Sequence, residues 1–102
     1  MSKIYLIKED CGYYKIGFTK NKVQSRVYQL QTGNSDNFEI IEVFETKHNR
    51  KIETTLHNRY KHKRVAREFF NLDQSEVNSF ISMCNTIEKG YDAIRELNNT
   101  FY

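Results

Sequence analysis

The sequence predicts a small α/β fold: a mixed or antiparallel sheet of about three to four strands, flanked by helices in the order β-β-α-β-α-β-α. Two observations support it. Short β-prone runs alternate with segments whose apolar residues recur every three to four positions, and turn formers separate them. The 102 residues are 38% hydrophobic and 14% aromatic, enough for one modest core. We therefore expect a single domain over residues 1–102.

The first two strands are expected at residues 3–8 and 13–18, where Ile, Tyr, Leu and Phe are frequent. The polar segment 9–12 between them ends in Gly12, which is typical of a tight turn. Two short strands joined in this way predict a β-hairpin.

A helix is expected next, because Val23, Val27 and Leu30 are spaced i, i+4 and i+7. Asn21 is a suitable N-cap for this helix. A glycine and a run of turn formers at 32–37 end it.

Residues 38–45 combine Phe, Ile and Val in a third strand, which we expect to lie in the centre of the sheet. The spacing becomes helical again from about 47 to 60. In that segment Ile52, Leu56 and Tyr60 form one apolar stripe.

A basic loop at 61–64 precedes a short return or edge strand at 67–72. Asp73 or Ser75 then caps a last helix with an apolar face. Gly90 is expected to break this helix, with the apolar face continuing beyond it.

The net charge of +3 is mildly basic, so it permits a nucleic-acid partner without requiring one. No run approaches the roughly 18 uninterrupted apolar residues of a membrane span. The N-terminus enters a strand pattern at once and lacks a signal-peptide layout, so an intracellular protein without a membrane partner is expected. Cys11 and Cys84 are isolated in the sequence, which predicts two free thiols and argues against a zinc site.

Four polar residues occupy positions that the core does not explain. Tyr5 and Lys15 lie on the two hairpin strands, and a nearby cation would lower the pKa of the phenol and make it a credible general base. Arg26 interrupts the apolar face of its helix, where a guanidinium can clamp a phosphate. Glu53 lies one helical turn before His57, and a lone carboxylate suits magnesium, which keeps most of its waters. Together they predict metal-assisted phosphodiester hydrolysis.

Each of these residues also has a purely structural interpretation. Tyr5 is consistent with packing in a strand, and Lys15 with an exposed face or edge. Arg26 could extend over the core, and Glu53 could pair with Arg50 or with His57 on its own helix. The functional interpretation therefore depends on their joint arrangement.

That arrangement resembles the GIY-YIG nuclease superfamily. Residues 3–5 (Lys-Ile-Tyr) resemble its G-I-Y motif, and residues 15–17 (Lys-Ile-Gly) resemble its Y-I-G motif with Lys in place of Tyr. A phage- and virus-associated branch reads K-I-G at this point, followed by a helix arginine. Residues 53–57 match its E-x-x-L-H-like helix, and residues 68–72 match its closing Glu-aromatic-Phe segment. The matches run in order over a motif core at 3–72, leaving 73–102 as a C-terminal helical extension.

The resemblance implies a metal-dependent endonuclease that hydrolyses phosphodiester bonds of DNA, with RNA as the alternative substrate. Tyr5, assisted by Lys15, would act near the attacking water, and Arg26 would bind the scissile phosphate. Glu53 would hold one Mg²⁺ or Mn²⁺, with His57 on the same side of its helix. The protein would be a monomer or homodimer in a bacterial host's cytoplasm, or in a host cell for a viral source.

Seven further residues are predicted to contact the nucleic-acid backbone in a salt-sensitive, sequence-independent manner. They follow the second motif and the Glu53 helix: Thr19, Lys20, Lys22, Lys61, Lys63, Arg64 and Arg67. A solvated basic loop is the competing interpretation. Two other functions remain open at this stage: a nucleic-acid-binding module that has lost catalysis, and a small interaction or regulatory protein on the same fold.

Overall fold

The computed structural model describes residues 1–32 and 37–101, with side chains described as far as residue 97. It confirms the α/β class. The strands are β1 (Ser2–Glu9), β2 (Tyr14–Thr19), β3 (Phe38–Thr46), β4 (Arg64–Ala66) and β5 (Phe69–Phe70). The helices are α1 (Val23–Gln31), α2 (Asn49–Arg59), the 3₁₀ turn η1 (Lys61–Lys63), α3 (Gln74–Asn78) and α4 (Phe80–Phe101).

The strands form one sheet in the order β3-β1-β2-β5-β4, and all its described pairings are antiparallel. The predicted hairpin of β1 and β2 is present, with Tyr5 opposite Gly17 and Ile7 opposite Lys15. Gly12 takes a φ of 98° in the connecting turn, a conformation that glycine adopts without steric cost.

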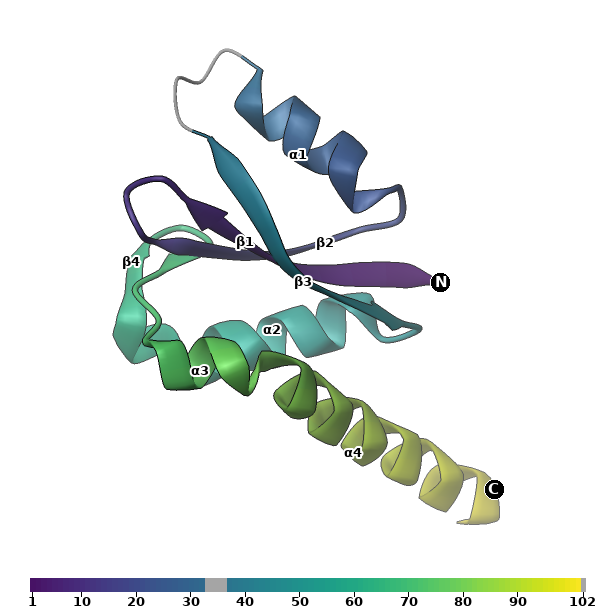
Figure 1. The fold of residues 1–102 in the computed structure, drawn as a ribbon. Helices are drawn as coiled ribbons and strands as arrows, with labels where there is room; N and C mark the ends of the chain where they lie inside the picture. The colour runs from purple at the N-terminus through teal and green to yellow at the C-terminus, as the bar shows by residue number, and fades with distance from the viewer. Residues whose placement is uncertain (33–36, 102) are drawn as a thin grey trace.

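The sheet separates two layers of helix (Figure 1). On one face α1 packs its buried Val23 and Val27 against Tyr5 and Ile7. On the other face the larger core joins the opposite side of β1 and β2 to α2, α3 and α4, with Leu56, Phe70 and Phe80 fully buried. The alternation of side chains along β1 therefore supplies both cores.

β3 lies at an edge of the sheet, so its predicted central position is wrong. β1 lies inside the sheet, between β3 and β2, and every residue from Ile4 to Ile7 is at most 1% exposed. β3 instead carries a glutamate at every third position: Glu39, Glu42 and Glu45. Charges of this kind protect an edge strand from pairing with other chains. The sheet also has one strand more than the upper predicted number, because part of the expected basic loop forms β4.

Two predicted helix ends, at Asn21 and at Gly90, differ from the structure. Asn21 is not the N-cap of α1: Lys22 holds that position, and the Asn21 N–H donates to Thr19 Oγ1 at 3.1 Å. Gly90 does not break α4, because glycine weakens a helix interior by about 1 kcal/mol without forbidding it. Contacts on both sides of Gly90 hold the helix: Glu88 accepts a hydrogen bond from Thr46 at 2.7 Å, and Asp92 bonds to His48 at 2.9 Å. Residues 33–36 of the predicted turn lie outside the described part of the chain.

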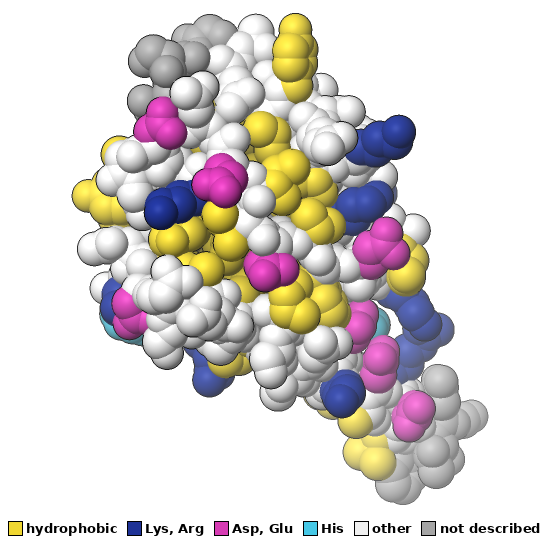
Figure 2. All heavy atoms as spheres, viewed as in Figure 1, with side chains coloured by type: hydrophobic (Ala, Val, Ile, Leu, Met, Phe, Trp, Pro, Cys, Tyr) yellow, Lys and Arg dark blue, Asp and Glu magenta, His cyan; other side chains and the backbone are white. Residues whose placement is uncertain are grey.

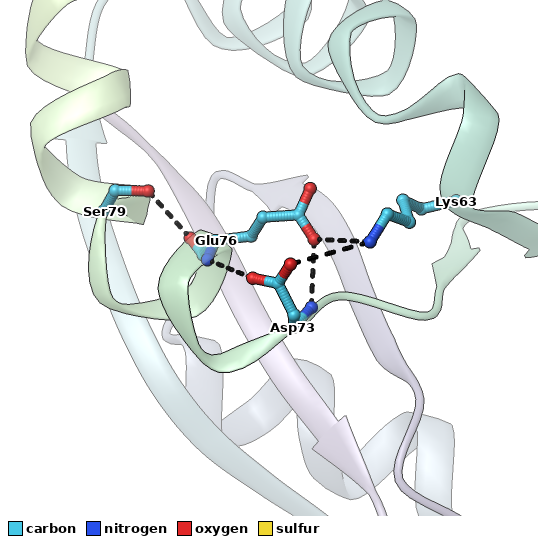
Figure 3. A network of polar contacts seen from close by, with 4 residues as sticks. All are labelled: Lys63, Asp73, Glu76 and Ser79. Carbon is cyan, nitrogen blue, oxygen red and sulfur yellow. Dashed lines mark hydrogen bonds and ion pairs between the residues drawn. The ribbon is translucent and has the colours of Figure 1, made fainter.

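Asp73 is confirmed as a cap, but of the short α3, which precedes the long C-terminal helix (Figure 3). Its carboxylate accepts from the Glu76 N–H at 2.8 Å, and Glu76 accepts from the Asp73 N–H at 2.9 Å. This reciprocal pair is a capping box. Lys63 reaches both carboxylates, at 3.2 Å to Glu76 and 3.7 Å to Asp73, and so fastens η1 to the start of α3.

α4 projects past the sheet and lengthens the molecule to 53 × 28 × 21 Å. The radius of gyration of 14.6 Å exceeds the value of about 13 Å expected for a compact chain of this length. Figure 2 shows apolar side chains gathered in the middle of the viewed face, with more along the projecting helix, where Ile94 and Leu97 are exposed. Within the described residues, no helix is both long and apolar enough to span a membrane.

Candidate active site

Lys15 lies in the middle of the candidate site, on β2, and is only 7% exposed. Its ammonium group donates to the Glu68 carboxylate, which comes from the turn between β4 and β5. The same ammonium lies 5.3 Å from the centre of the Phe69 ring. A buried lysine requires such a partner, because an isolated charge inside a protein is strongly unfavourable.

Tyr5 shares the α1-facing side of the sheet with Lys15. It is 1% exposed, and its hydroxyl lies above Gly17, two residues along β2 from Lys15. A Cβ at Gly17 would come within 2.4 Å of that hydroxyl, so the close approach requires glycine here. The hairpin therefore places Tyr5 and Lys15 on one face as predicted, although the ammonium of Lys15 pairs with Glu68.

His57 joins α2 to the edge of β2. The Ile16 N–H donates to the Glu68 carbonyl at 3.2 Å, and the Ile16 carbonyl is 2.9 Å from His57 Nε2. Because a carbonyl only accepts, Nε2 carries a hydrogen in this arrangement. The ring also lies 5.1 Å from the Phe70 ring. His57 thus positions α2, and with it Glu53, against the strand that carries Lys15.

Glu53 is half-buried, and none of the described residues gives its carboxylate a hydrogen bond or an ion pair. Burial raises its pKa above the ordinary value, because desolvation disfavours the charged form. The charge of His57 opposes this shift, Glu68 adds to it, and Lys15 opposes it more weakly. The carboxylate of Glu53 is therefore within electrostatic range of His57, Glu68 and Lys15. Within the described residues, no group of three or more His, Cys, Asp or Glu could hold a metal ion.

Arg26 is half-buried on α1, and its Nε is a buried donor for which the described residues provide no hydrogen-bond partner. Such an atom is unfavourable unless something else satisfies it. Leu30 lies one turn further along the same side of α1 and lines a pocket that also contains Lys15 and Glu68. Arg26 therefore shares the side of α1 that carries Leu30, one turn before it, and is not among the residues that line this pocket.

This pocket has a volume of about 430 Å³ and opens where the C-terminal end of α1 faces the sheet. It joins residues from α1, β2, β3, the β4–β5 turn and β5: Leu30, Lys15, Phe38, Arg67, Glu68 and Phe69. Arg67 has a φ of 50°, a left-handed conformation that is strained for a residue with a side chain. The turn that presents Glu68 to Lys15 is therefore held by its surroundings rather than by local preference.

Glu68 is the residue that the predicted site lacked. Its signal in the sequence is the Glu-Phe-Phe segment at 68–70, a motif match that assigns the carboxylate no role. The ion pair between Glu68 and Lys15 joins positions 53 residues apart, so no local sequence pattern predicts it.

The predicted nucleic-acid-binding residues divide into exposed and engaged groups. Five are exposed and lie on the surface: Lys20, Lys22, Lys61, Arg64 and Arg67. Lys63 instead forms ion pairs with Asp73 and Glu76 (Figure 3). Thr19 is 8% exposed and accepts the Asn21 N–H, so its hydroxyl shapes the turn before α1.

Comparison with known protein families finds that residues 3–85 match the T5orf172 domain. This domain is phage-associated and is found in the context of nuclease-like proteins. Comparison with curated proteins and with solved structures finds no match. The matched segment contains every residue of the candidate site and ends within α4.

Proposed function

The chain belongs to the T5orf172 domain family, and from this membership and the geometry of the site we propose that it is a metal-dependent endonuclease of the GIY-YIG type. The observation that supports this most is the Glu53 carboxylate: half-buried, without a hydrogen-bond partner among the described residues, and within the charge influence of Lys15, His57 and Glu68. A carboxylate desolvated in this way has no evident structural use.

The residues fit a single Mg²⁺ or Mn²⁺. Magnesium commonly takes one or two protein carboxylates and keeps several waters, so the absence of a larger ligand cluster in the described part of the chain agrees with it. Glu53 would be the protein ligand. When bound, the metal would supply positive charge against the scissile phosphate and favour the ionised form of Glu53.

The chain's own residues divide the remaining work. Arg26 would donate to the phosphate, which would satisfy its unpartnered Nε and stabilise the charge that gathers in the transition state. Tyr5 would lie near the attacking water, with Lys15 on the same face of the hairpin. Glu68 is a positioning residue, because it holds the ammonium of Lys15 in place. His57 positions Glu53 by tying α2 to β2.

A cleavage assay tests this proposal. The purified chain should cut plasmid, branched or single-stranded DNA in Mg²⁺ or Mn²⁺ and should cut nothing in EDTA. Glu53→Ala should abolish cutting, because it removes the protein ligand. Glu45→Ala is the matched control, since Glu45 is an exposed glutamate on the edge strand β3. If wild type cuts nothing under any of these conditions, or if Glu53→Ala cuts as well as wild type, the nuclease proposal fails.

A second candidate is a DNA-binding module without catalysis, and one observation favours it. Tyr5 is 1% exposed and the charge of Lys15 is neutralised by Glu68, so both groups are less available than free ones. Salt-sensitive DNA binding without cutting in the same assay would select this candidate.

A further inference from the structure

The pocket beside the Lys15–Glu68 pair has aromatic surfaces on two sides. Phe38 comes from β3 and Phe69 from β5, and the sheet order places β1 and β2 between them. Leu30 contributes a third apolar surface from the end of α1. Flat aromatic and aliphatic surfaces of this kind are those on which unpaired nucleobases stack.

The same pocket offers polar groups to the edge of a base. Glu68 uses Oε2 for Lys15, and its Oε1 has no hydrogen bond with any described residue. Every unpaired nucleobase has an amino or ring N–H group available for hydrogen bonding, and a carboxylate oxygen can accept from it. The pocket volume of about 430 Å³ falls in the usual range of small-molecule sites.

Arg67 supplies the third element. It is exposed, lines the pocket and has a φ of 50°, a left-handed conformation that is uncommon for a residue with a side chain. Residues held in sparsely populated conformations cluster at ligand-binding sites. A guanidinium can stack on a base and bind a phosphate, so it suits the entrance of a nucleotide pocket.

We propose that this pocket binds one unpaired nucleobase of a DNA strand, so that the enzyme selects DNA with an unpaired nucleotide next to the cleaved bond. The proposal rests on the nuclease function above and names its substrate class. The pocket shares Lys15 and Glu68 with the reaction site, so a nucleotide whose phosphate lies there has its base within reach. A base stacked in an intact duplex cannot enter the pocket without being extruded.

A fluorescent base gives a direct test that does not depend on cleavage. The full chain is titrated, in EDTA, into a duplex with a single bulged 2-aminopurine and into the same duplex with that base paired. The expected result is quenching and tighter binding for the bulged duplex only. Phe69→Leu should weaken binding of the bulged duplex by about tenfold or more and leave the paired duplex unchanged, since it removes the stacking ring.

Two variants separate ligand binding from folding. Arg67→Gly relieves the left-handed strain, so its Tm should equal or exceed that of wild type while quenching and affinity fall. Tyr28→Leu changes an aromatic residue that is 74% exposed on α1 and outside the pocket, and it should behave as wild type.

The proposal is overturned by equal affinity for the bulged and paired duplexes, by no binding of the bulged duplex at low salt, or by unchanged quenching in both Phe69→Leu and Arg67→Gly. A preference for the same bulge in RNA over DNA overturns the assignment of the strand. Glu53→Gln, assayed in parallel with Mg²⁺, should bind and quench without cutting. Quenching without any cleavage by wild type would therefore refute the nuclease function and keep the base pocket.

Discussion

At the scale of single residues, the partial burial of Glu53 disfavours its ionised form in the folded protein, so the carboxylate suits a ligand better than it stabilises the fold. The folded state raises the pKa of this carboxyl mainly by desolvation, so the native protein binds the proton more tightly than the unfolded chain does. At a pH above both pKa values the ionised group is less favourable in the folded state. This unfavourable contribution disappears as the pH falls through the raised pKa.

We therefore expect Glu53→Gln to raise the Tm at neutral pH in EDTA while it abolishes metal-dependent cutting. The gain in Tm should shrink as the pH falls and wild-type Glu53 becomes protonated. Thermal melts of both proteins between about pH 4 and pH 8 check this, with Glu45→Gln as the exposed control. A variant less stable than wild type at neutral pH would mean that the carboxylate is a structural partner, contrary to its assignment here.

A second residue-scale prediction concerns Gly17, whose missing side chain makes room for Tyr5. Gly17→Ala places a methyl group within 2.4 Å of the Tyr5 hydroxyl, so we expect a loss of about 1–3 kcal/mol in the free energy of unfolding. Gly90→Ala is the matched control, because its Cβ meets nothing within 4 Å and lies inside α4. It should gain about 0.5–1 kcal/mol. Urea unfolding of the three proteins measures both changes, and an unaffected Gly17→Ala would disprove the close approach.

At the scale of elements, neighbouring lysines of η1 have different tasks. Lys63 joins η1 to the capping box of α3 (Figure 3). Lys61 is exposed and has no ion pair with a described residue. The association of Asp73 and Lys63 also lowers the pKa of Asp73, after the larger effect of the Glu76 N–H. The predicted basic loop at 61–64 therefore contains one lysine with a structural role, Lys63, and one exposed lysine, Lys61.

This division predicts opposite phenotypes for two charge-removing variants. Lys63→Gln should lower the Tm and leave the salt dependence of DNA binding unchanged. Lys61→Gln should leave the Tm unchanged and reduce the slope of log K against log salt by about 0.9, the value for one lost phosphate contact on duplex DNA. Binding isotherms from about 50 to 200 mM salt, together with melts, measure both. If the slope falls for Lys63→Gln instead, its ion pairs open on DNA and the division is wrong.

At the scale of the whole molecule, features encoded in neighbouring residues could be predicted and features that join distant segments could not. The β1–β2 turn, the Val23–Val27 stripe and the Asp73 cap each follow from residues within a few positions of one another. The edge position of β3 depends on the order of all five strands, which local periodicity does not contain. The same holds for α4, whose continuity through Gly90 depends on contacts with β3 and with His48, before α2.

The candidate site shows the same limit. The strand motif was enough to place Tyr5 and Lys15 on one face, because side chains alternate along paired strands. The Lys15–Glu68 pair and the His57–Ile16 hydrogen bond join residues 53 and 41 positions apart. Only the folded sheet brings them together, so Glu68 and the positioning use of His57 emerged from the structure.

The initial rate of phosphodiester cleavage in Mg²⁺, compared between wild type and Glu53→Gln on one bulged DNA duplex, tests the central claim most directly. We expect cleavage by wild type that requires the metal, no detectable cleavage by Glu53→Gln, and unchanged binding of the duplex in EDTA by both proteins. Equal rates for the two proteins, or a wild type that binds the duplex and leaves it intact in both Mg²⁺ and Mn²⁺, would contradict it.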